Sequence, residues 1–310
     1  MTGTQAKQPV RPFFPLDEQV IENWLSSLDV GNSTKRAYKL GMKVFCEYVY
    51  VNELDFDQLE EKDILDYKND LFSRDLSIAT CNQYLAAVRS FYRHAAANSL
   101  NNIAANIHGE STGKDFKKDT LSAAQVKKLL QVMPKETETN LRDFALVNLM
   151  VRTGLRDIEI SRALVEDIRT INGQDVLFVQ GKGHKSKDAF VVLSPSTLNP
   201  IKEYLKTRKV KGSSPLFTST SNNSKGKALT TRSISKIVKN SMKGIGIDSE
   251  RFTAHSLRHT AITLALVAGA SPQQVRDMAR HASIDTTLIY SHNLDRISDA
   301  AEYSVDSILS

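Results

Sequence analysis

The chain has 310 residues, enough for two domains that each bury their own core. Hydrophobic residues make up 41% and charged residues 25%, which is ordinary for a globular protein in water. No apolar run approaches the roughly 20 residues of a membrane span, so no transmembrane helix is implied and no membrane partner is expected. Residues 1–16 lack the apolar stretch of a signal peptide and are predicted to form a flexible tail.

The net charge of +6 is distributed unevenly along the chain. Residues 1–118 contain 14 basic and 16 acidic residues, a net of −2, whereas residues 119–310 contain 27 basic and 19 acidic residues, a net of +8. This excess in the second part favours a polyanionic partner. Many basic surfaces only meet solvent, so charge alone does not decide the function.

Both cysteines, Cys46 and Cys81, fall inside predicted helices, and neither belongs to a CxxC pair. This pattern is typical of small core residues in a reducing compartment. It does not indicate a disulfide framework or a metal site. We therefore expect a cytoplasmic protein.

Residues 17–106 are predicted to form a helical domain. The first helix begins at Asp17 and places apolar residues at helical spacing, namely Val20, Ile21, Trp24, Leu25 and Leu28. Ser33 or Thr34 can cap the second helix. That helix is expected to bury Ala37, Leu40, Val44, Phe45 and Tyr48. A third helix is expected over about residues 60–74, and a fourth over residues 77–97, with an apolar face of Leu85, Val88, Phe91 and Tyr92.

Basic side chains share faces of the second and fourth helices because they recur about one helical turn apart. They are Lys35, Arg36, Lys39 and Lys43 on the second helix and Arg89 and Arg93 on the fourth. One hypothesis is that these faces bind DNA. Plain solvated faces explain the same pattern equally well.

A linker and the start of a second domain are indicated after the fourth helix. Residues 107–120 are polar, charged and contain glycine, which predicts a linker. The second domain then covers residues 121–310. Ser122 with Gln125 three residues later is a capping-box pattern for its first helix.

The next helix covers residues 141–153 and ends at Gly154, which is a typical C-terminal stop. A further helical segment covers residues 157–164. After Glu166 the hydrophobic period becomes that of strands.

Three antiparallel strands are predicted in this domain. Residues 168–171 and 176–179 flank Asn172-Gly173, a strong hairpin signal. A third strand, residues 189–193, follows a second glycine-bearing turn. Helices return over residues 196–209 and 231–243, and a short tail helix closes the chain at residues 297–309. The predicted fold class is therefore mainly α with a small antiparallel β-sheet.

Two polar turns of the second domain contain candidate site residues. Arg156 follows the Gly154 stop, where its planar guanidinium can bind two phosphate oxygens. Glu159 can hold that arginine or a neighbouring histidine, although such an arginine alone is more often a structural salt bridge. Lys182 lies between two glycines at a hairpin tip and has the reach to protonate a leaving oxygen. A plain surface lysine fits that position as well.

The stretch from His255 to His292 concentrates histidines and arginines around one tyrosine. His255, Arg258 and His259 fall at i, i+3 and i+4, so at least two of them share a helical face. Tyr290 has an ordinary pKa of about 10 and needs positive neighbours and a proton acceptor to act as a nucleophile. A single tyrosine is more commonly a buried core residue whose hydroxyl makes a hydrogen bond than a nucleophile.

A metal-binding pair, His255 and His259, is disfavoured because the sequence lacks the glutamate of an HExxH motif and an evident third ligand. No metal site is therefore predicted. His281 and His292 are equally compatible with capping or core hydrogen bonds.

The ordered motifs of the second domain resemble those of the tyrosine recombinases, also called phage-type integrases, and in particular the Xer-like members. The matching residues are Arg156 in TGLR, Lys182 in GKG, His255 and Arg258 in HSLRHT, and His281 and Tyr290 in RHASIDTTLIYSH. The resemblance covers nearly the whole chain, as a helical core-binding domain, a linker and a catalytic domain.

The resemblance implies that two arginines, Arg156 and Arg258, clamp the scissile phosphate of DNA and stabilise its transition state. His255 and His281 would add hydrogen bonds to that phosphate. His255 would also be a candidate to accept the proton of the attacking tyrosine.

It also implies that Tyr290 forms a 3′-phosphotyrosine and that Lys182 protonates the leaving 5′ oxygen. Glu159 matches an acidic position that supports the site. No cofactor is expected, because arginines neutralise the charge that a magnesium ion neutralises elsewhere. His259 and His292 are left with structural roles.

The resemblance has two departures. The family commonly has glycine before the histidine at 281, where this chain has Arg280, and an arginine where this chain has Lys187. Arg280 is predicted to contact DNA phosphate or to cover a helix end.

The expected function is site-specific recombination of double-stranded DNA by a homo-tetramer through a Holliday junction. The tail helix, residues 297–309, would dock onto a neighbouring protomer or onto its own subunit. A type IB-like DNA topoisomerase shares the same catalytic groups and is the first alternative. A DNA-binding protein without catalysis is the second.

Overall fold

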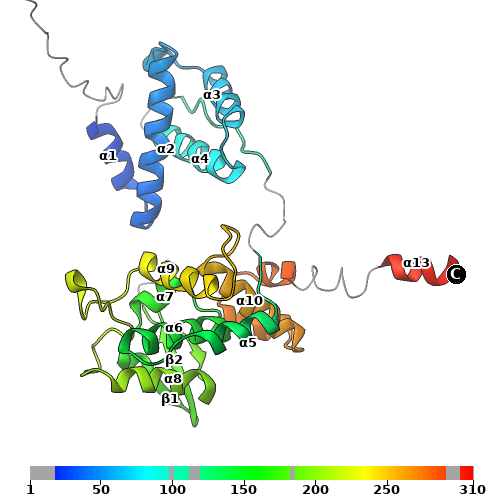
Figure 1. Ribbon diagram of the computed structural model, residues 1–310. Coiled ribbons are helices and arrows are strands. Elements are labelled where there is room, and N and C mark those ends of the chain that lie inside the picture. Colours follow the sequence, from blue (N-terminus) through cyan, green and yellow to red (C-terminus); the bar gives the residue numbers. More distant parts are fainter. Residues whose placement is uncertain (1–17, 98–100, 112–118, 182–185, 291–300, 310) are drawn as a thin grey trace, which may run out of the picture. The chain divides into compact units, whose positions relative to one another are not determined.

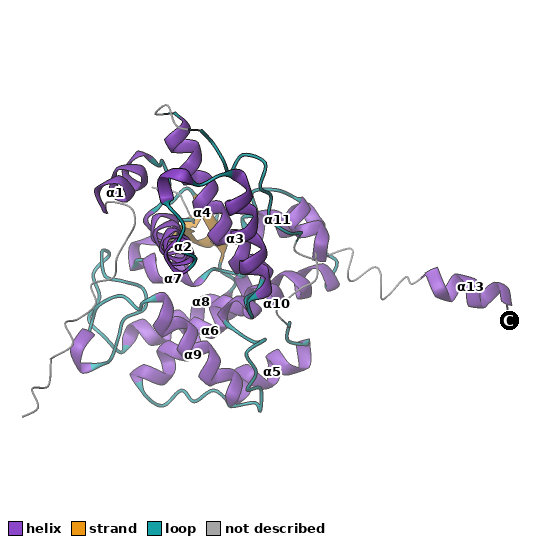
Figure 2. Ribbon diagram, turned by 90° about the horizontal axis from the view of Figure 1, so that it is seen from above, coloured by secondary structure: helices purple, strands orange, loops and turns teal. Residues whose placement is uncertain are grey.

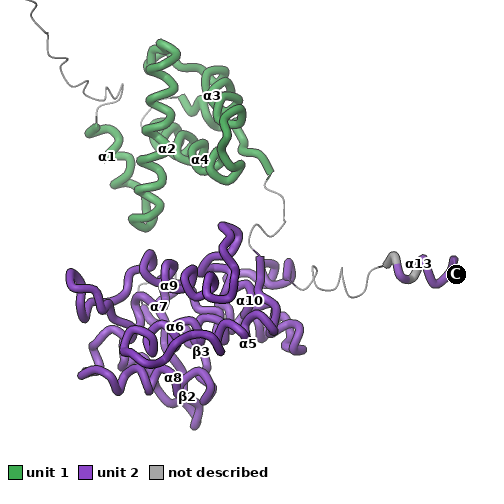
Figure 3. Tube along the Cα trace, in the orientation of Figure 1, with its two compact units in different colours: residues 1–113 green, residues 114–310 purple. Residues whose placement is uncertain are grey.

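The computed structural model describes residues 18–97, 101–111, 119–181, 186–290 and 301–309. The chain divides into two compact units, residues 1–113 and residues 114–310 (Figure 3). Helices make up most of both units, and the strands of the described residues form one small sheet (Figure 2). The predicted fold class, mainly α with a small antiparallel β-sheet, is confirmed.

Unit 1 is a helical bundle in which α2 packs along α4 (Figure 1). Its helices are α1 (Glu18–Ser27), α2 (Asn32–Val51), α3 (Glu61–Ser73) and α4 (Ile78–Ala96), with a 3-10 turn at Phe56–Gln58. Aromatic rings fill the core: Trp24 meets Phe91 edge to face at 5.6 Å between centroids, and Phe45 meets Tyr67 at 4.9 Å. These contacts add to the burial that stabilises the bundle.

Two details of the predicted apolar faces are wrong. Leu40 is 49% exposed and Val20 is 42% exposed, whereas Met42 and Val49 are fully buried on α2. At 3.6 residues per turn Leu40 lies about 140° around the helix from buried Phe45, so both cannot face the core. The predicted Ser33 or Thr34 cap is also wrong, because α2 begins after Gly31 and no side chain caps it.

Both cysteines are buried and free, in keeping with the predicted core role. Residues that follow α4 also belong to the packing of unit 1. Ile107 is 4% exposed within the unit 1 core, and Glu110 pairs with Lys68 at 2.8 Å. Residues 107–111 of the predicted linker therefore pack with unit 1, and residues 112–118 lie outside the described residues.

Unit 2 is built around α6, against which α5, α8 and α10 pack (Figure 1). Its helices are α5 (Ala123–Val132), α6 (Glu138–Thr153), α7 (Asp157–Arg162), α8 (Pro195–Lys206), α9 (Thr231–Lys243), α10 (Ala254–Val267), α11 (Pro272–Ala279) and α13 (Ala301–Leu309). Residues 285–290 are also helical. The capping box of Ser122 and Gln125 and the stop at Gly154 are confirmed.

The sheet has the order β1-β2-β3, with β1 (Ile168–Ile171), β2 (Gln174–Val179) and β3 (Ala189–Val192) all antiparallel. The predicted hairpin is confirmed. Its turn residues Asn172 and Gly173 have φ of 50° and 78°, the left-handed region that this tight turn requires. None of the helices in the described segments has the length and apolar character needed to span a bilayer.

Candidate active site

The corner between α6 and α7 positions the first arginine of the site. Gly154 ends α6 with φ 62°, a conformation that favours glycine, and the chain then turns into α7. Arg156 stands immediately before α7. Its backbone N–H donates to Glu159 Oε2 at 2.7 Å, and its Nη1 donates to Oε1 at 3.1 Å. The carboxylate one turn into the helix therefore fixes both the backbone and the side chain of Arg156.

Glu159 is fully buried between two guanidinium groups. Arg280 Nη2 donates to its Oε2 at 2.7 Å and Arg280 Nε to its Oε1 at 3.2 Å. Burial raises the pKa of Glu159, but the hydrogen bonds and charges of Arg280 and Arg156 outweigh it and lower the pKa below 4.5. Ionised Glu159 thus stabilises the fold at neutral pH, and this contribution is lost as the pH falls through the lowered pKa.

The two departures from the family pattern have structural partners. Arg280 ends α11 with φ 55°, where glycine is usual, and its side chain also donates to the Met278 carbonyl. Lys187 pairs with the buried carboxylate of Asp167 at 2.5 Å. The Arg280 contacts support a role in holding Glu159, and its predicted contact with DNA stays a prediction.

Arg258 is 2% exposed on α10 and links three segments of unit 2. It donates to the Gly154 carbonyl at 2.6 Å and to the Ala279 carbonyl at 2.5 Å. Burial, together with the charges of Arg156 and Arg280, lowers its pKa to about 9. The guanidinium is still charged at neutral pH, so the fold keeps a positive charge at a nearly dry position.

The second arginine meets the first at a small cavity. Arg156, His255 and Arg258 line a space of about 150 Å³ together with Ser235 from α9. A water requires only about 10–15 Å³ of such space, so a larger group fits. Asp157 also lines the cavity, and its Oδ1 accepts a hydrogen bond from the Ile158 N–H. The charges of the two guanidinium groups exceed that of this one carboxylate, so with the imidazole and the hydroxyl the cavity can bind an anion.

The histidines of α10 share one face, as their spacing predicted. The rings of His255 and His259 meet edge to face at 4.5 Å between centroids. His259 Nδ1 contacts the Tyr290 hydroxyl, and their ring centroids are 5.4 Å apart. The structural role expected for His259 and the role of His255 as the candidate proton acceptor for Tyr290 both stay predictions, and the histidine in contact with the Tyr290 hydroxyl is His259.

His281 and Tyr290 complete the cluster. His281 Nδ1 shares a hydrogen bond of 2.8 Å with buried Thr287, and its ring stacks toward Tyr290 at 6.4 Å. Burial, then the charges of Arg258 and Arg156, lower the pKa of His281 to about 4. Tyr290 is 6% exposed, and burial raises its pKa to about 12 although both arginines oppose the shift.

Some predicted residues are not placed. Lys182 and His292 lie outside the described residues.

On the helices of unit 1, Arg36, Lys43 and Arg93 are exposed. Lys39 pairs with Glu22 at 2.5 Å, and Lys35 and Arg89 are partly exposed. DNA contact by these residues stays a prediction.

A basic face of α9 was missed from sequence. Arg232, Lys236, Lys239 and Lys243 recur every three or four residues, so they share a face with Ser235 of the small cavity. This spacing was visible in the sequence. Its relevance appears only because the fold brings α9 to the cavity of Arg156.

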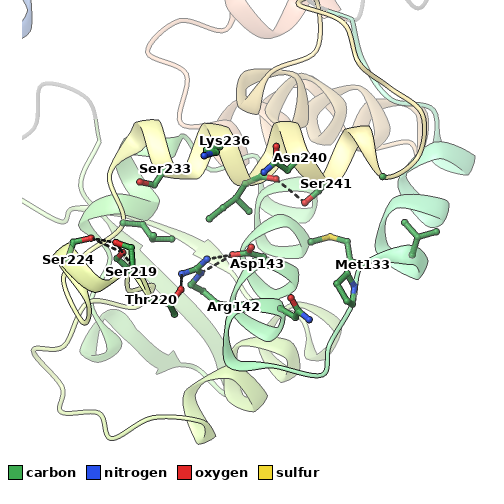
Figure 4. Close-up of a pocket in the computed structure, with 17 residues that line it drawn as sticks. Met133, Arg142, Asp143, Ser219, Thr220, Ser224, Ser233, Lys236, Asn240 and Ser241 are labelled. Carbon is green, nitrogen blue, oxygen red and sulfur yellow. Dashed lines mark hydrogen bonds and ion pairs between the residues drawn. The ribbon is translucent and has the colours of Figure 1, made fainter.

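A larger pocket, of about 530 Å³, lies elsewhere in unit 2, between α6, α9 and the loop at 219–224 (Figure 4). The guanidinium of its buried residue Arg142 already binds other groups of the protein. It donates to the Thr218 carbonyl at 3.0 Å and pairs with Asp143 at 2.7 Å. His255, Arg258, His281 and Tyr290 do not line it. The pocket of Figure 4 therefore contributes none of these groups to the site.

Comparison with known proteins shows the family to which the chain belongs. Residues 119–296, more than half of the chain, match the phage integrase family, and residues 21–99 match the phage integrase N-terminal SAM-like domain. The chain belongs to the phage integrase family. The family predicted from the order of the motifs is confirmed.

Similar members of this family span most of the chain. The tyrosine recombinase XerD of Oceanobacillus iheyensis is 28% identical over 288 residues, which cover 89% of this chain and 94% of that protein. The tyrosine recombinase XerC of Pelobacter propionicus is 30% identical over 269 residues, which cover 85% and 86%. The fold resembles that of the XerH recombinase bound to its palindromic difH substrate after cleavage, with a TM-score of 0.73, 24% identity, and coverage of 92% of this chain and 84% of that one.

Proposed function

We propose that this integrase-family protein is a site-specific DNA recombinase that cleaves and rejoins DNA through a 3′-phosphotyrosine on Tyr290. The observation that carries the proposal is the convergence of Arg156 and Arg258 on one small cavity. Arg258 donates to the Ala279 carbonyl, two residues before His281, and the ring of His281 stacks toward the nucleophile candidate Tyr290. A charged diester needs these cations when its phosphorus is attacked.

In the proposed reaction, Arg156 and Arg258 bind the two non-bridging oxygens of the scissile phosphate. Glu159 and the Gly154 and Ala279 carbonyls fix these guanidinium groups before DNA arrives, so little reorganisation accompanies the reaction. His255 and His281 supply further hydrogen bonds. The phosphorus–O5′ bond breaks as the bond to Tyr290 forms, and Lys182 gives the leaving oxygen its proton.

The two parts of the chain are proposed to have different roles, DNA binding and catalysis. Residues 17–106 are proposed to be the core-binding domain, and residues 121–310 the catalytic domain. XerH has been solved with its difH site, and the Tn1549 integrase with transposon right-end DNA, which supports double-stranded DNA as the partner here. The family match favours recombination over a topoisomerase or a binding protein without catalysis.

We propose that the active assembly is a homo-tetramer on DNA in which protomers exchange their C-terminal tail helices. Support comes from α13, whose apolar side chains are exposed on the described chain: Tyr303, Val305, Ile308 and Leu309. An apolar face of this kind is stabilised when it is covered by a partner surface. Light scattering of the protein–DNA complex distinguishes a tetramer from smaller assemblies.

Covalent capture tests the proposed function. A nicked suicide substrate that contains the recombination site loses the short strand after cleavage, so the phosphotyrosine cannot be reversed. We expect an adduct that resists SDS and that forms equally well in excess EDTA, because arginines carry the charge neutralisation. Dependence of the adduct on a divalent metal would contradict this assignment.

A supercoil-relaxation assay and the suicide substrate together separate the alternatives. A topoisomerase relaxes supercoiled DNA that lacks the site, whereas a recombinase is expected to need it. A binding protein without catalysis retains the DNA and forms no adduct. Either of these results would overturn the recombinase proposal.

The basic faces of α2 and α9 are proposed to bind the DNA backbone. Replacing Arg36 or Lys239 with alanine should weaken binding uniformly across sequences and reduce the slope of log K against log salt by about 0.9 for each phosphate that the variant no longer neutralises. Lys202→Ala, at an exposed position of α8, is the matched control and should leave the slope unchanged. Binding curves at several salt concentrations measure these slopes, and equal slopes for all three variants would contradict the proposal.

A further inference from the structure

We propose that His259 is a catalytic residue that accepts the proton of Tyr290 as the hydroxyl attacks phosphorus and returns it when the strand is rejoined. The proposal rests on the proposed function and concerns the identity of the proton acceptor. It differs from the assignment that resemblance alone suggested, which was His255.

Contact geometry is the first support. His259 Nδ1 meets the Tyr290 hydroxyl directly, whereas the described contact of His255 is the edge-to-face packing against the His259 ring. His255 instead lines the small cavity with Arg156 and Arg258. The two histidines of α10 are thus divided between the nucleophile and the phosphate site.

The surroundings keep His259 neutral before the reaction. Burial, together with the neighbouring His255, Arg258 and His281, lowers its pKa to about 4. A neutral imidazole has one unprotonated nitrogen, so Nδ1 can accept the hydroxyl proton while Nε2 carries its own. Tyr290 itself, with its pKa raised to about 12 by burial, releases almost no proton to water at neutral pH.

The proton balance closes over both halves of the reaction. In cleavage, the Oη–H bond of Tyr290 breaks, Oη bonds to phosphorus, and the proton moves to His259 Nδ1. The P–O5′ bond breaks and its electron pair takes a proton from the acid proposed at Lys182. In rejoining, a 5′ hydroxyl attacks phosphorus, and the imidazolium returns its proton to the departing tyrosine oxygen. The anionic phosphate held by the adjacent arginine site favours that imidazolium.

Placement on α10 also explains how the acceptor stays aligned. His259 and Arg258 are consecutive residues of one helix, and Arg258 is fixed to the Gly154 and Ala279 carbonyls. Ile262, one turn further along α10, belongs with Tyr290 to a buried cluster. The phosphate clamp and the proton acceptor therefore share one packed helix.

The test is His259→Asn, whose side-chain oxygen can replace Nδ1 as a hydrogen-bond acceptor but cannot take the proton. We expect single-turnover cleavage to fall by about 10²–10⁴-fold with DNA affinity retained. The residual rate should rise about tenfold per pH unit, because hydroxide must then generate the tyrosinate. His255→Asn is the matched control and should not acquire this pH dependence.

A substrate with sulfur in place of the bridging 5′ oxygen separates the acceptor from the acid. A thiolate leaves without a proton, so this substrate should restore cleavage by Lys182→Ala and should not restore His259→Asn. Cleavage by His259→Asn within about threefold of wild type, or its rescue by sulfur, would overturn the proposal.

Two checks keep the outcomes distinct. Adduct formation by the wild-type protein tests the proposed function independently of His259. Should the asparagine variant fail to fold, nitrogen-15 spectra of the wild-type histidine rings decide the matter. An unprotonated Nδ1 on His259 supports the proposal, and a protonated Nδ1 that donates to Tyr290 overturns it.

Discussion

Tyr290→Phe is expected to abolish the covalent protein–DNA adduct completely while binding of the DNA site persists. Phenylalanine retains the ring that packs in the buried cluster with Ile262 and Val275 and removes only the attacking oxygen. Removing one buried hydrogen bond to His259 costs about 1–3 kcal/mol of unfolding free energy, which the fold should tolerate. Denaturing gels of the suicide substrate measure the adduct, and gel shifts measure binding.

Tyr204→Phe is the matched control for this substitution. Tyr204 is also a buried tyrosine of unit 2, and its hydroxyl shares a hydrogen bond of 3.0 Å with Thr218. Removing that hydroxyl should lower stability by a similar amount and leave the adduct intact. An adduct that survives Tyr290→Phe would show that another residue is the nucleophile.

Arg258→Ala is expected to reduce the rate of adduct formation by at least about 100-fold with only a modest fall in DNA affinity. The guanidinium is fixed and nearly dry, so its charge acts on the developing transition state with little screening. DNA affinity is the sum of many interactions with phosphates, of which this variant removes one. The variant also leaves the Gly154 and Ala279 carbonyls without their donor, so a lower melting temperature is expected.

Arg142→Ala separates the two effects of removing a buried arginine. Arg142 is 5% exposed and donates to the Thr218 carbonyl, but it lies in the pocket of Figure 4. This variant should be less stable and keep its rate of cleavage below its melting temperature. An equal fall in cleavage for Arg142→Ala and Arg258→Ala would mean that Arg258 acts through stability alone. Arg258→Lys keeps the charge without the planar fork and should remain impaired.

Local chemistry explains which parts of the fold were predictable. Asn172-Gly173 specifies its tight turn, Ser122 with Gln125 specifies a capping box, and Gly154 specifies a helix end. Each of these signals acts over a few residues, so the surrounding fold need not be known. The apolar face of α2 was not predictable from such local signals, because Leu40 and Met42 are both apolar and only packing decides which of them is buried.

The sequence by itself determined the family and the fold class, because these depend on the order of motifs and on local turn and cap chemistry. Only the tertiary structure decided which of the polar side chains contact one another. It placed His259 on the Tyr290 hydroxyl, His255 at the arginine cavity, and Arg280 on Glu159. The physical reason is that these pairs join segments up to 121 residues apart in sequence, and their contacts depend on how the helices rotate and pack against one another.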